Sequence, residues 1–242
     1  MESYSYDMRL GKIKRMFENG SVTVCGMRGS GKDMLFSNII ERRKKPHLSN
    51  IPYNEDTILF DYSKLDCGGN SYKDFIKGNV KPYVFPYPDG TDIYLSDCGV
   101  YFPSQYCNEL NRDFREFPTF LALSRHLGKC SVHFNSQDIG RNWDKIREQS
   151  DSFIMCLWCK VICGVVIQKI RIYDRYDACK ARVRPCRIKK PLICLNPDRL
   201  LQIRMYQDNF YNQHGKVSEH ILVYTNRSKY DTRYFKTLLE KR

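Results

Sequence analysis

The alternation of apolar and polar positions divides most of this chain into short strands and helices. A β-branched run at 21–25 predicts a strand, the glycine-rich stretch 26–31 a loop, and 32–43 a helix that ends before Pro46. Further strands are expected at 57–62, 92–97, 131–135, 153–158 and 165–173, and further helices at 8–20, 72–77, 104–114, 118–127 and 142–150. Strands that alternate with helices indicate an α/β fold with a mostly parallel sheet, in which the last two strands form a hairpin.

Beyond residue 173 the periodicity weakens, and only 197–205 and 234–241 have helical character. We therefore expect a core at 1–175, with a basic extension at 176–242 packed on or beside it. At 242 residues, with 42% hydrophobic and 13% aromatic positions, the chain is globular and needs neither disulfides nor a structural metal to fold.

The net charge indicates the type of binding partner, and the cysteine content indicates the cellular compartment. Forty Lys and Arg against 27 Asp and Glu give a net charge of +13, which favours a polyanionic partner, either nucleic acid or an anionic membrane surface. The eleven cysteines are irregularly spaced, and no apolar leader precedes them, so reduced thiols in the cytoplasm are expected. Cys156 and Cys159 lie in an apolar strand, which favours buried free thiols over a zinc site. Lys160 interrupts the apolar stretch 153–168, which is too short to span a bilayer.

The loop 26–33 matches the pattern G-x-x-x-x-G-K, directly between a strand and a helix. Its glycines let backbone N–H groups surround a phosphate, the helix N-terminus adds positive potential, and the lysine reaches the outer phosphates. We predict ATP as the ligand. The predicted nucleotide-binding residues are Gly26, Met27, Arg28, Gly29, Ser30, Gly31, Lys32, Asp33 and Met34.

Asp33 stands where the pattern has a Ser or Thr hydroxyl that binds Mg²⁺. Asp33 can ligate Mg²⁺ directly, or it can weaken nucleotide binding. The plainer interpretation is a favourable acidic residue in the first turn of a helix, and both interpretations can hold together. Asp97, at the end of an apolar strand, is the second predicted Mg²⁺ ligand, although an aspartate here can also simply start the turn at 98–99. Cys98 follows it where many ATPases have a glutamate base, so general-base catalysis is in doubt.

Three further side chains are candidates for the reaction. Gln137 ends a strand on the side where ligands bind to open parallel sheets, so it can position water or sense the γ-phosphate, or it can cap the next turn. Arg125, with His126 beside it, and Arg147 are candidate fingers toward the nucleotide of a neighbouring subunit, although most surface arginines have no such role.

A basic stretch runs from 160 to 204, with twelve positive residues against Asp174, Asp177 and Asp198. Tyr173 and Tyr176 are interleaved with these charges, which suits a surface that follows the backbone of single-stranded nucleic acid or contacts anionic lipid. A solvated basic face is the alternative. Nothing in the stretch would read bases, so salt-sensitive and sequence-tolerant binding is expected.

In their order along the chain, these motifs resemble the N-terminal ATPase domain of the zonular occludens toxin-like family, which includes filamentous-phage assembly ATPases and is related to the FtsK/HerA motors. The matching pieces are 22–32, the strand with Asp97 followed by 100–103, 124–127 leading to the strand that ends at Gln137, and 146–147. The resemblance implies a RecA-like P-loop core, a homo-oligomeric ring, and ATP-driven export or packaging of single-stranded phage DNA at the host inner membrane. Asp33 and Cys98 depart from the family pattern, and its membrane segment is missing, so a membrane-embedded partner protein would supply the anchor.

The combined expectation is a cytoplasmic P-loop ATPase, peripheral to the membrane through that partner. In this interpretation Lys32 holds phosphates, Asp97 organises Mg²⁺, Gln137 positions water, and Arg125 or Arg147 crosses the ring interface. The main alternative is a nucleotide-binding switch or scaffold with little hydrolysis, which Asp33 and Cys98 favour. A basic nucleic-acid-binding module without nucleotide and a small-molecule kinase are the remaining alternatives.

Overall fold

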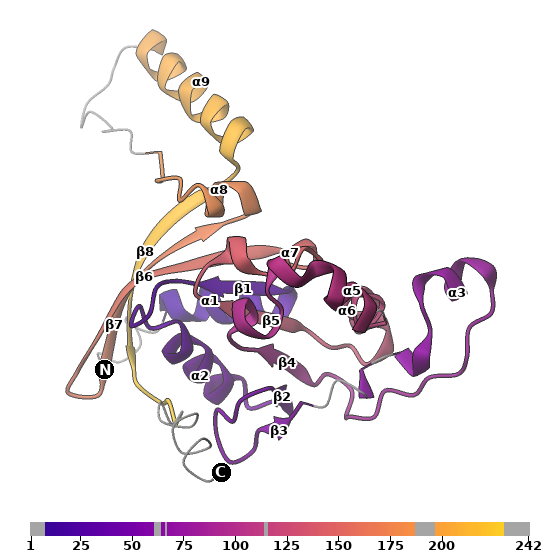
Figure 1. Cartoon of the computed structure of the whole chain (residues 1–242). Helices are drawn as coiled ribbons and strands as arrows, with labels where there is room; N and C mark the ends of the chain where they lie inside the picture. The colour runs from indigo at the N-terminus through magenta and orange to yellow at the C-terminus, as the bar shows by residue number, and fades with distance from the viewer. Residues whose placement is uncertain (1–7, 61–63, 66, 114–115, 187–196, 230–242) are drawn as a thin grey trace.

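The computed structural model describes residues 8–60, 64–65, 67–113, 116–186 and 197–229 (Figure 1). Within these residues a single sheet has the strand order β3-β2-β4-β5-β1-β6-β7-β8. Pairing is parallel from β3 to β6 and antiparallel from β6 to β8. The strands are β1 (Val22–Cys25), β2 (His47–Ser49), β3 (Ile58–Leu59), β4 (Asp92–Leu95), β5 (Val132–Ser136), β6 (Ser152–Ile162), β7 (Val165–Tyr173) and β8 (Val217–Thr225). The predicted mostly parallel α/β sheet and its terminal hairpin are confirmed.

Helices connect the parallel strands. They are α1 (Met8–Asn19), α2 (Lys32–Arg43), α3 (Tyr72–Lys77), α4 (Cys98–Tyr101), α5 (Cys107–Asp113), α6 (Phe117–Leu127), α7 (Asp144–Glu148), α8 (Tyr176–Lys180) and α9 (Pro197–His214), with 3-10 turns at Cys67–Gly69, Ser104–Tyr106 and Ile139–Arg141. The predicted helices at 8–20, 32–43, 72–77 and 118–127 are confirmed to within a residue at each end.

Other predicted boundaries were wrong. Of the strand expected at 57–62, the described residues 57–60 contain only the two-residue β3, and residues 61–62 lie outside the described part. β2 was missed because three residues after Pro46 are too few to show a periodicity. The helix expected at 104–114 begins as a 3-10 turn, and the one expected at 142–150 is confined to α7. β6 continues four residues beyond the predicted 153–158, because it pairs with β7 up to the hairpin turn. The predicted helix at 234–241 lies outside the described residues.

The C-terminal part contributes to the sheet. β8, which sequence periodicity did not reveal, pairs with all nine residues of β7, and α9 is longer than the predicted 197–205. In Figure 1, α9 stands away from the sheet while β8 runs along its edge. A boundary at 175 therefore divides one continuous sheet, and the division into core and extension stays a prediction.

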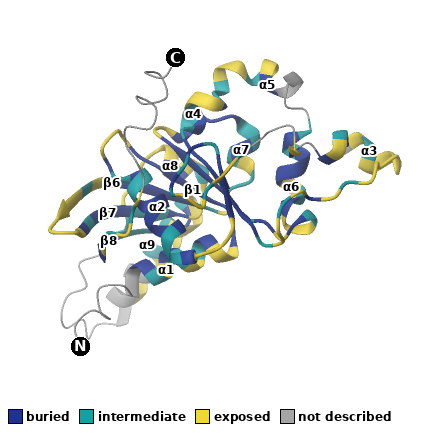
Figure 2. Cartoon of the chain, turned by 90° about the horizontal axis from the view of Figure 1, so that it is seen from below, coloured by how far each residue is buried: buried dark blue, intermediate teal, exposed yellow. Residues whose placement is uncertain are grey.

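Helices cover both faces of the sheet. Val22 and Val24 of β1 pack with α1 and α2, whereas Cys25 packs on the other face, against residues of β6, β7 and α8. This division follows from strand geometry, because successive side chains point to opposite faces. Figure 2 shows the central strands buried, and α3 and the far end of the β6–β7 hairpin exposed. None of the described helices combines the length and the apolar character needed to cross a membrane.

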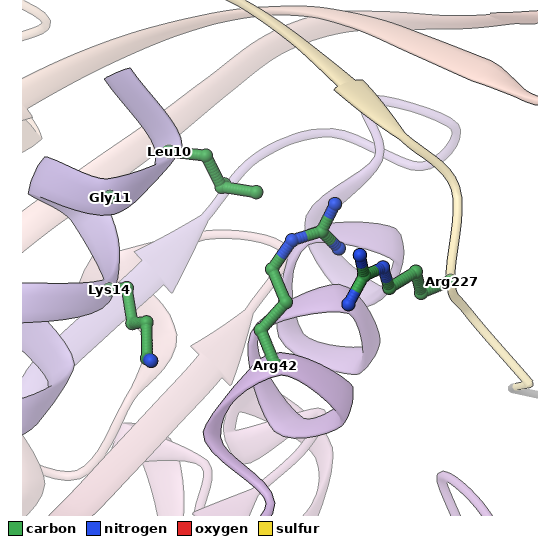
Figure 3. Close-up of a pocket in the computed structure, with 5 residues that line it drawn as sticks. All are labelled: Leu10, Gly11, Lys14, Arg42 and Arg227. Carbon is green, nitrogen blue, oxygen red and sulfur yellow. The ribbon is translucent and has the colours of Figure 1, made fainter. Parts of the chain in front are cut away.

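The chain that leaves β8 returns to the N-terminal helices. Arg42 of α2 donates from Nη2 to the Thr225 carbonyl at 2.8 Å, and the Arg227 amide donates to Asn38 Oδ1 at 2.7 Å. A pocket of about 230 Å³ lies here, and Figure 3 shows Lys14, Arg42 and Arg227 around it. These contacts attach the end of β8 to the helix that carries the glycine loop.

Candidate phosphate-binding site

The glycine loop connects the C-terminal end of β1 to the N-terminus of α2. Its first amide, Gly26 N, donates to the Ser136 carbonyl of β5 at 3.2 Å, and Ser30 N donates to the Met27 carbonyl at 3.1 Å. Gly29 and Gly31 have φ values of 78° and 84°, in the left-handed region that glycine adopts without strain. The loop therefore turns back on itself and delivers the chain into α2 at Lys32, as the motif predicts.

The loop is packed tightly against the sheet. A Cβ atom at Gly26 would lie 2.6 Å from the Cys156 carbonyl oxygen and would also clash with Ser30 Oγ, so only glycine fits there. Ser30 Oγ is buried and has no hydrogen-bond partner within the described residues. A buried polar atom without a partner costs free energy, which an incoming hydrogen-bonding ligand would recover.

A buried amide from the antiparallel part of the sheet holds the end of the loop. Gln168 of β7 donates from Nε2 to the Gly31 carbonyl at 2.9 Å and to the Ser30 carbonyl at 3.3 Å. Its Oε1 accepts a 2.9 Å hydrogen bond from the Tyr224 hydroxyl of β8. Gln168 is fully buried. β7 and β8 thus help to fix the position of the last turn of the loop.

Lys32 and Asp33 form a local ion pair at the start of α2. Lys32 Nζ lies 3.2 Å from Asp33 Oδ2, and the Lys32 side chain is only 8% exposed. Asp33 Oδ1 accepts from Asn135 Nδ2 of β5 at 2.5 Å, while Asn135 Oδ1 has no partner within the described residues. Asp33 is therefore held by two donors, which accounts for a carboxylate at this position.

Asp97 follows the end of β4. Burial raises the pKa of its carboxyl, the positive charge of Lys32 lowers it, and the negative charge of Asp33 raises it. These influences place Asp97 in the same electrostatic environment as the loop. Its carbonyl also accepts from Val100 N at 2.7 Å, which starts α4. Asp97 thus starts a turn, as the plainer interpretation expects, and its carboxyl still interacts electrostatically with Lys32.

Cys98 does not offer a base. Its side chain is fully buried, and Sγ donates to the Leu95 carbonyl at 3.2 Å. Burial raises the pKa of this thiol to about 12, so it stays protonated at neutral pH.

The other candidates lie further from the loop's charged residues. Gln137 is exposed and lines a cleft with Gly26 and Met27. Arg125 Nη2 lies 2.5 Å from Asp151 Oδ2, which also accepts from Ser21 N at 2.7 Å, at the start of β1. Arg125 therefore lies near the N-terminal end of β1, whereas the loop follows its C-terminal end.

Arg147 also has a partner within the chain. It donates to the Tyr176 hydroxyl at 2.8 Å, with its guanidinium carbon 5.0 Å from the centre of that ring. A role for Arg125 or Arg147 in a neighbouring subunit's site requires each to leave these contacts, and it stays a prediction.

The residues present fit a nucleotide phosphate chain with Mg²⁺. The loop presents glycine amides, Lys32 and the unpartnered Ser30 hydroxyl, and Mg²⁺ is commonly held by one or two carboxylates with phosphate oxygens and water. Asp33 and Asp97 are the carboxylates available for that role. No cluster of three or more metal-ligating side chains occurs in the described part of the chain, so the protein alone would supply an incomplete shell.

Sequence reasoning missed Asn135, Gln168 and Tyr224. Asn135 precedes the predicted Gln137 on the same polar strand end, so the polarity of that segment was the available signal. Gln168 and Tyr224 gave a weaker signal, because β7 and β8 contain other polar residues as well, and the two side chains become informative only when the pairing is known.

No family model matches the chain, and no curated protein matches its sequence. Among solved structures, it is similar to the N-terminal domain of zonular occludens toxin from Neisseria meningitidis, with a TM-score of 0.43 and 11% identity over 90% of this chain and 97% of that one. It is also similar to the genome packaging NTPase B204 from Sulfolobus turreted icosahedral virus 2 in complex with AMPPCP, with a TM-score of 0.38 and 13% identity over 56% of this chain and 73% of that one.

Proposed function

We propose that this protein is a P-loop ATPase that binds ATP with Mg²⁺ in the loop between β1 and α2. The observation that carries the proposal is the position of Lys32. It starts α2 directly after a closed glycine loop, and its charge acts on Asp97 at the end of β4. One strand, β5, separates β1 from β4, and it supplies Asn135 to Asp33. These residues are the parts that phosphate binding and metal positioning require.

In this proposal each residue has a separate task. The loop amides and Lys32 bind the phosphates, since helix N-termini and lysine both favour negative charge. Asp97 and Asp33 orient Mg²⁺, which, when bound, neutralises charge on the transferred phosphoryl group. Asn135 holds Asp33 in place, and Gln137 is the side chain available to orient water. The work we propose for the ATPase is movement of single-stranded DNA in phage assembly, by a homo-oligomeric ring attached to the host membrane through a partner protein.

A second candidate is a nucleotide-dependent switch or scaffold with little turnover. It is favoured by the ion pair between Lys32 and Asp33, which competes with phosphate for the lysine. It is also favoured by Cys98, a buried and protonated thiol where a catalytic carboxylate would be useful.

The test is the steady-state rate of ATP hydrolysis with and without single-stranded DNA, for the wild type, Lys32→Ala and Asp97→Asn. An ATPase shows turnover that both substitutions abolish, and a DNA motor also shows stimulation by the strand. If ATP raises the melting temperature of the wild type but not of Lys32→Ala, while no variant hydrolyses it, the switch is the better description. If ATP leaves the wild-type melting temperature unchanged, both proposals are wrong.

A further inference from the structure

A second concave surface borders the glycine loop. It is a cleft of about 310 Å³ between the loop, the end of β5 and the segment around α8, and Gly26, Met27 and Gln137 line the side next to the loop. That volume is at the lower end of the roughly 300–1,000 Å³ typical of small-ligand pockets, which suits a ligand group of the size of one nucleotide unit.

The cleft lies on the face of the sheet opposite α2. Val24 and Ile154 pack in the core formed with α1 and α2, whereas Cys25 and Met155, the next residues along β1 and β6, line the cleft. Adjacent strand residues point to opposite faces. A ligand in the cleft therefore lies apart from the N-terminus of α2, and the two sites meet only at the start of the loop.

The rim of the cleft carries uncompensated positive charge. Lys180, Arg182 and Arg184 line it, all three are exposed, and none forms a salt bridge within the described residues. Asp138 is the only acidic residue among those that line the cleft, and its Oδ1 accepts from Gly140 N at 2.9 Å. The charge of the rim is thus available to an anion.

Arg171, which also lines the cleft, differs from these three. Its Nε lies 2.7 Å from Glu219 Oε2, and Lys169 Nζ lies 2.9 Å from the other oxygen of that carboxylate. Arg171 is therefore part of the wall, where it shares the single carboxylate of Glu219 with Lys169. The pocket of Figure 3 also differs, because Arg42 there already donates to Asn38 and to the Thr225 carbonyl.

The floor is apolar. Cys25, Ile139, Met155 and Leu157 line the cleft below the charged rim. A cationic rim above an apolar floor matches a nucleotide unit, whose phosphates need positive charge and whose base gains from contact with apolar surface.

We propose that this cleft binds single-stranded nucleic acid, with the phosphate backbone on Lys180, Arg182 and Arg184 and a base against the apolar floor. The proposal rests on the proposed ATPase, because the strand would be the substrate that the neighbouring loop acts on. Gly26, Met27 and Gln137 border the cleft, so an occupying strand would contact the loop that holds the nucleotide. In this proposal the rim contacts phosphates and the base meets only apolar surface, so binding should depend on salt and tolerate sequence.

The test compares two triple variants with equal net charge. Lys180→Gln/Arg182→Gln/Arg184→Gln removes the rim, and Lys73→Gln/Lys77→Gln/Lys81→Gln removes three exposed lysines on and after α3, far from the cleft (Figure 1). Affinity for a labelled oligothymidylate is measured by fluorescence anisotropy between 50 and 300 mM salt. For single strands each phosphate contact contributes about 0.7 to the slope of log K against log salt, so the rim variant should lose about 2 in slope and about a hundredfold in affinity near 0.1 M.

The control variant should stay within about threefold of the wild type under the same conditions. Equal losses of affinity in both variants would show a general charge effect and would overturn the proposal that the cleft binds the strand. Absence of strand binding by the wild type would overturn it as well. Competition by thymidine monophosphate as effective as by the oligonucleotide would assign the cleft to free nucleotides, which also contradicts the proposal.

ATP binding, measured on the same proteins, separates the two proposals. We expect the rim variant to keep the ATP-induced rise in melting temperature while it loses the strand. If ATP protects no variant and the rim variant alone loses the strand, the ATPase proposal fails and the strand site stands.

Discussion

Gln168 of β7 donates a 2.9 Å hydrogen bond to the carbonyl of Gly31, 137 residues away in the sequence. The same amide accepts from Tyr224 of β8. Three segments that are distant along the chain therefore determine one peptide of the phosphate loop. This contact links the glycine loop to strands that lie outside the parallel part of the sheet.

Substitution of Gln168 should destabilise the loop more than substitution of its hydrogen-bond partner Tyr224 does. Gln168→Met keeps the volume but leaves two buried loop carbonyls without their donor, and we expect a loss of about 1–3 kcal/mol in unfolding free energy, with weaker ATP binding. Tyr224→Phe removes one hydrogen bond and should cost about 1 kcal/mol. Urea denaturation and ATP titration measure both effects. Gln213→Met, at an exposed position of α9, is the control and should change neither quantity. Unchanged ATP affinity in Gln168→Met would contradict the role of the amide.

Two glycines of the loop provide a matched pair. Gly29→Ala places a Cβ where no atom lies within 4 Å, so it costs only the left-handed strain of about 1–2 kcal/mol. Gly31→Ala carries the same strain and adds a clash with Cys159 and a 2.9 Å approach to Gln168 Nε2. We expect Gly31→Ala to lower the free energy of unfolding by at least about 2 kcal/mol more than Gly29→Ala. Equal losses in chemical denaturation would show that the packing at Gly31 is unimportant.

Asp33 should affect nucleotide binding in opposite directions with and without Mg²⁺. Asp33→Asn removes a negative charge 3.2 Å from Lys32 Nζ, so Mg²⁺-free ATP should bind roughly tenfold more tightly. If Asp33 also ligates the metal, the improvement that Mg²⁺ gives to ATP binding should shrink in the variant. Calorimetric titration with Mg²⁺ and with EDTA measures both constants. A variant that binds Mg²⁺-free ATP no better than the wild type would contradict the competition between Asp33 and phosphate.

Glu219 should make the free energy of unfolding depend on pH in the acidic range. Burial alone would raise the pKa of this carboxyl, but the bonds from Arg171 and Lys169 lower it to about 2. A carboxyl whose pKa is lower in the folded than in the unfolded protein stabilises the fold above its ordinary pKa, near 4.5, and loses that contribution as the pH falls toward 2.

Glu219→Gln should therefore cost about 1–3 kcal/mol of unfolding free energy at pH 7, and the difference from the wild type should shrink as the pH falls from 4.5 toward 2. Glu148→Gln is the control, because Glu148 pairs with Lys145 at an exposed site and should contribute less than about 1 kcal/mol. A pH-independent difference for Glu219→Gln would sink this assignment. The same variant frees Arg171 in the cleft and should strengthen strand binding.

The sequence by itself determined the loop and its ends. Gly29, Gly31 and Lys32 lie between a β-branched strand and a helix, and the features that matter there are local: left-handed φ values, a helix N-terminus and a short reach to phosphate. The position of Asp97 was predictable for the same reason, because an apolar strand places the carboxylate that follows it, while its role with Mg²⁺ stays a prediction. The local pattern of apolar and polar residues also predicted most helices and the β6–β7 hairpin.

Only the tertiary structure decided which distant residues reach the loop. Asn135, two positions before the predicted Gln137, holds Asp33, while Gln137 borders the cleft instead. Arg125 lies near the N-terminal end of β1, away from the loop, and Gln168 reaches the loop from two strands away. A shift of one residue in register moves a side chain to the other face of a sheet, so such contacts depend on the pairing of distant segments. That pairing results from burial of the whole core, which local periodicity does not encode.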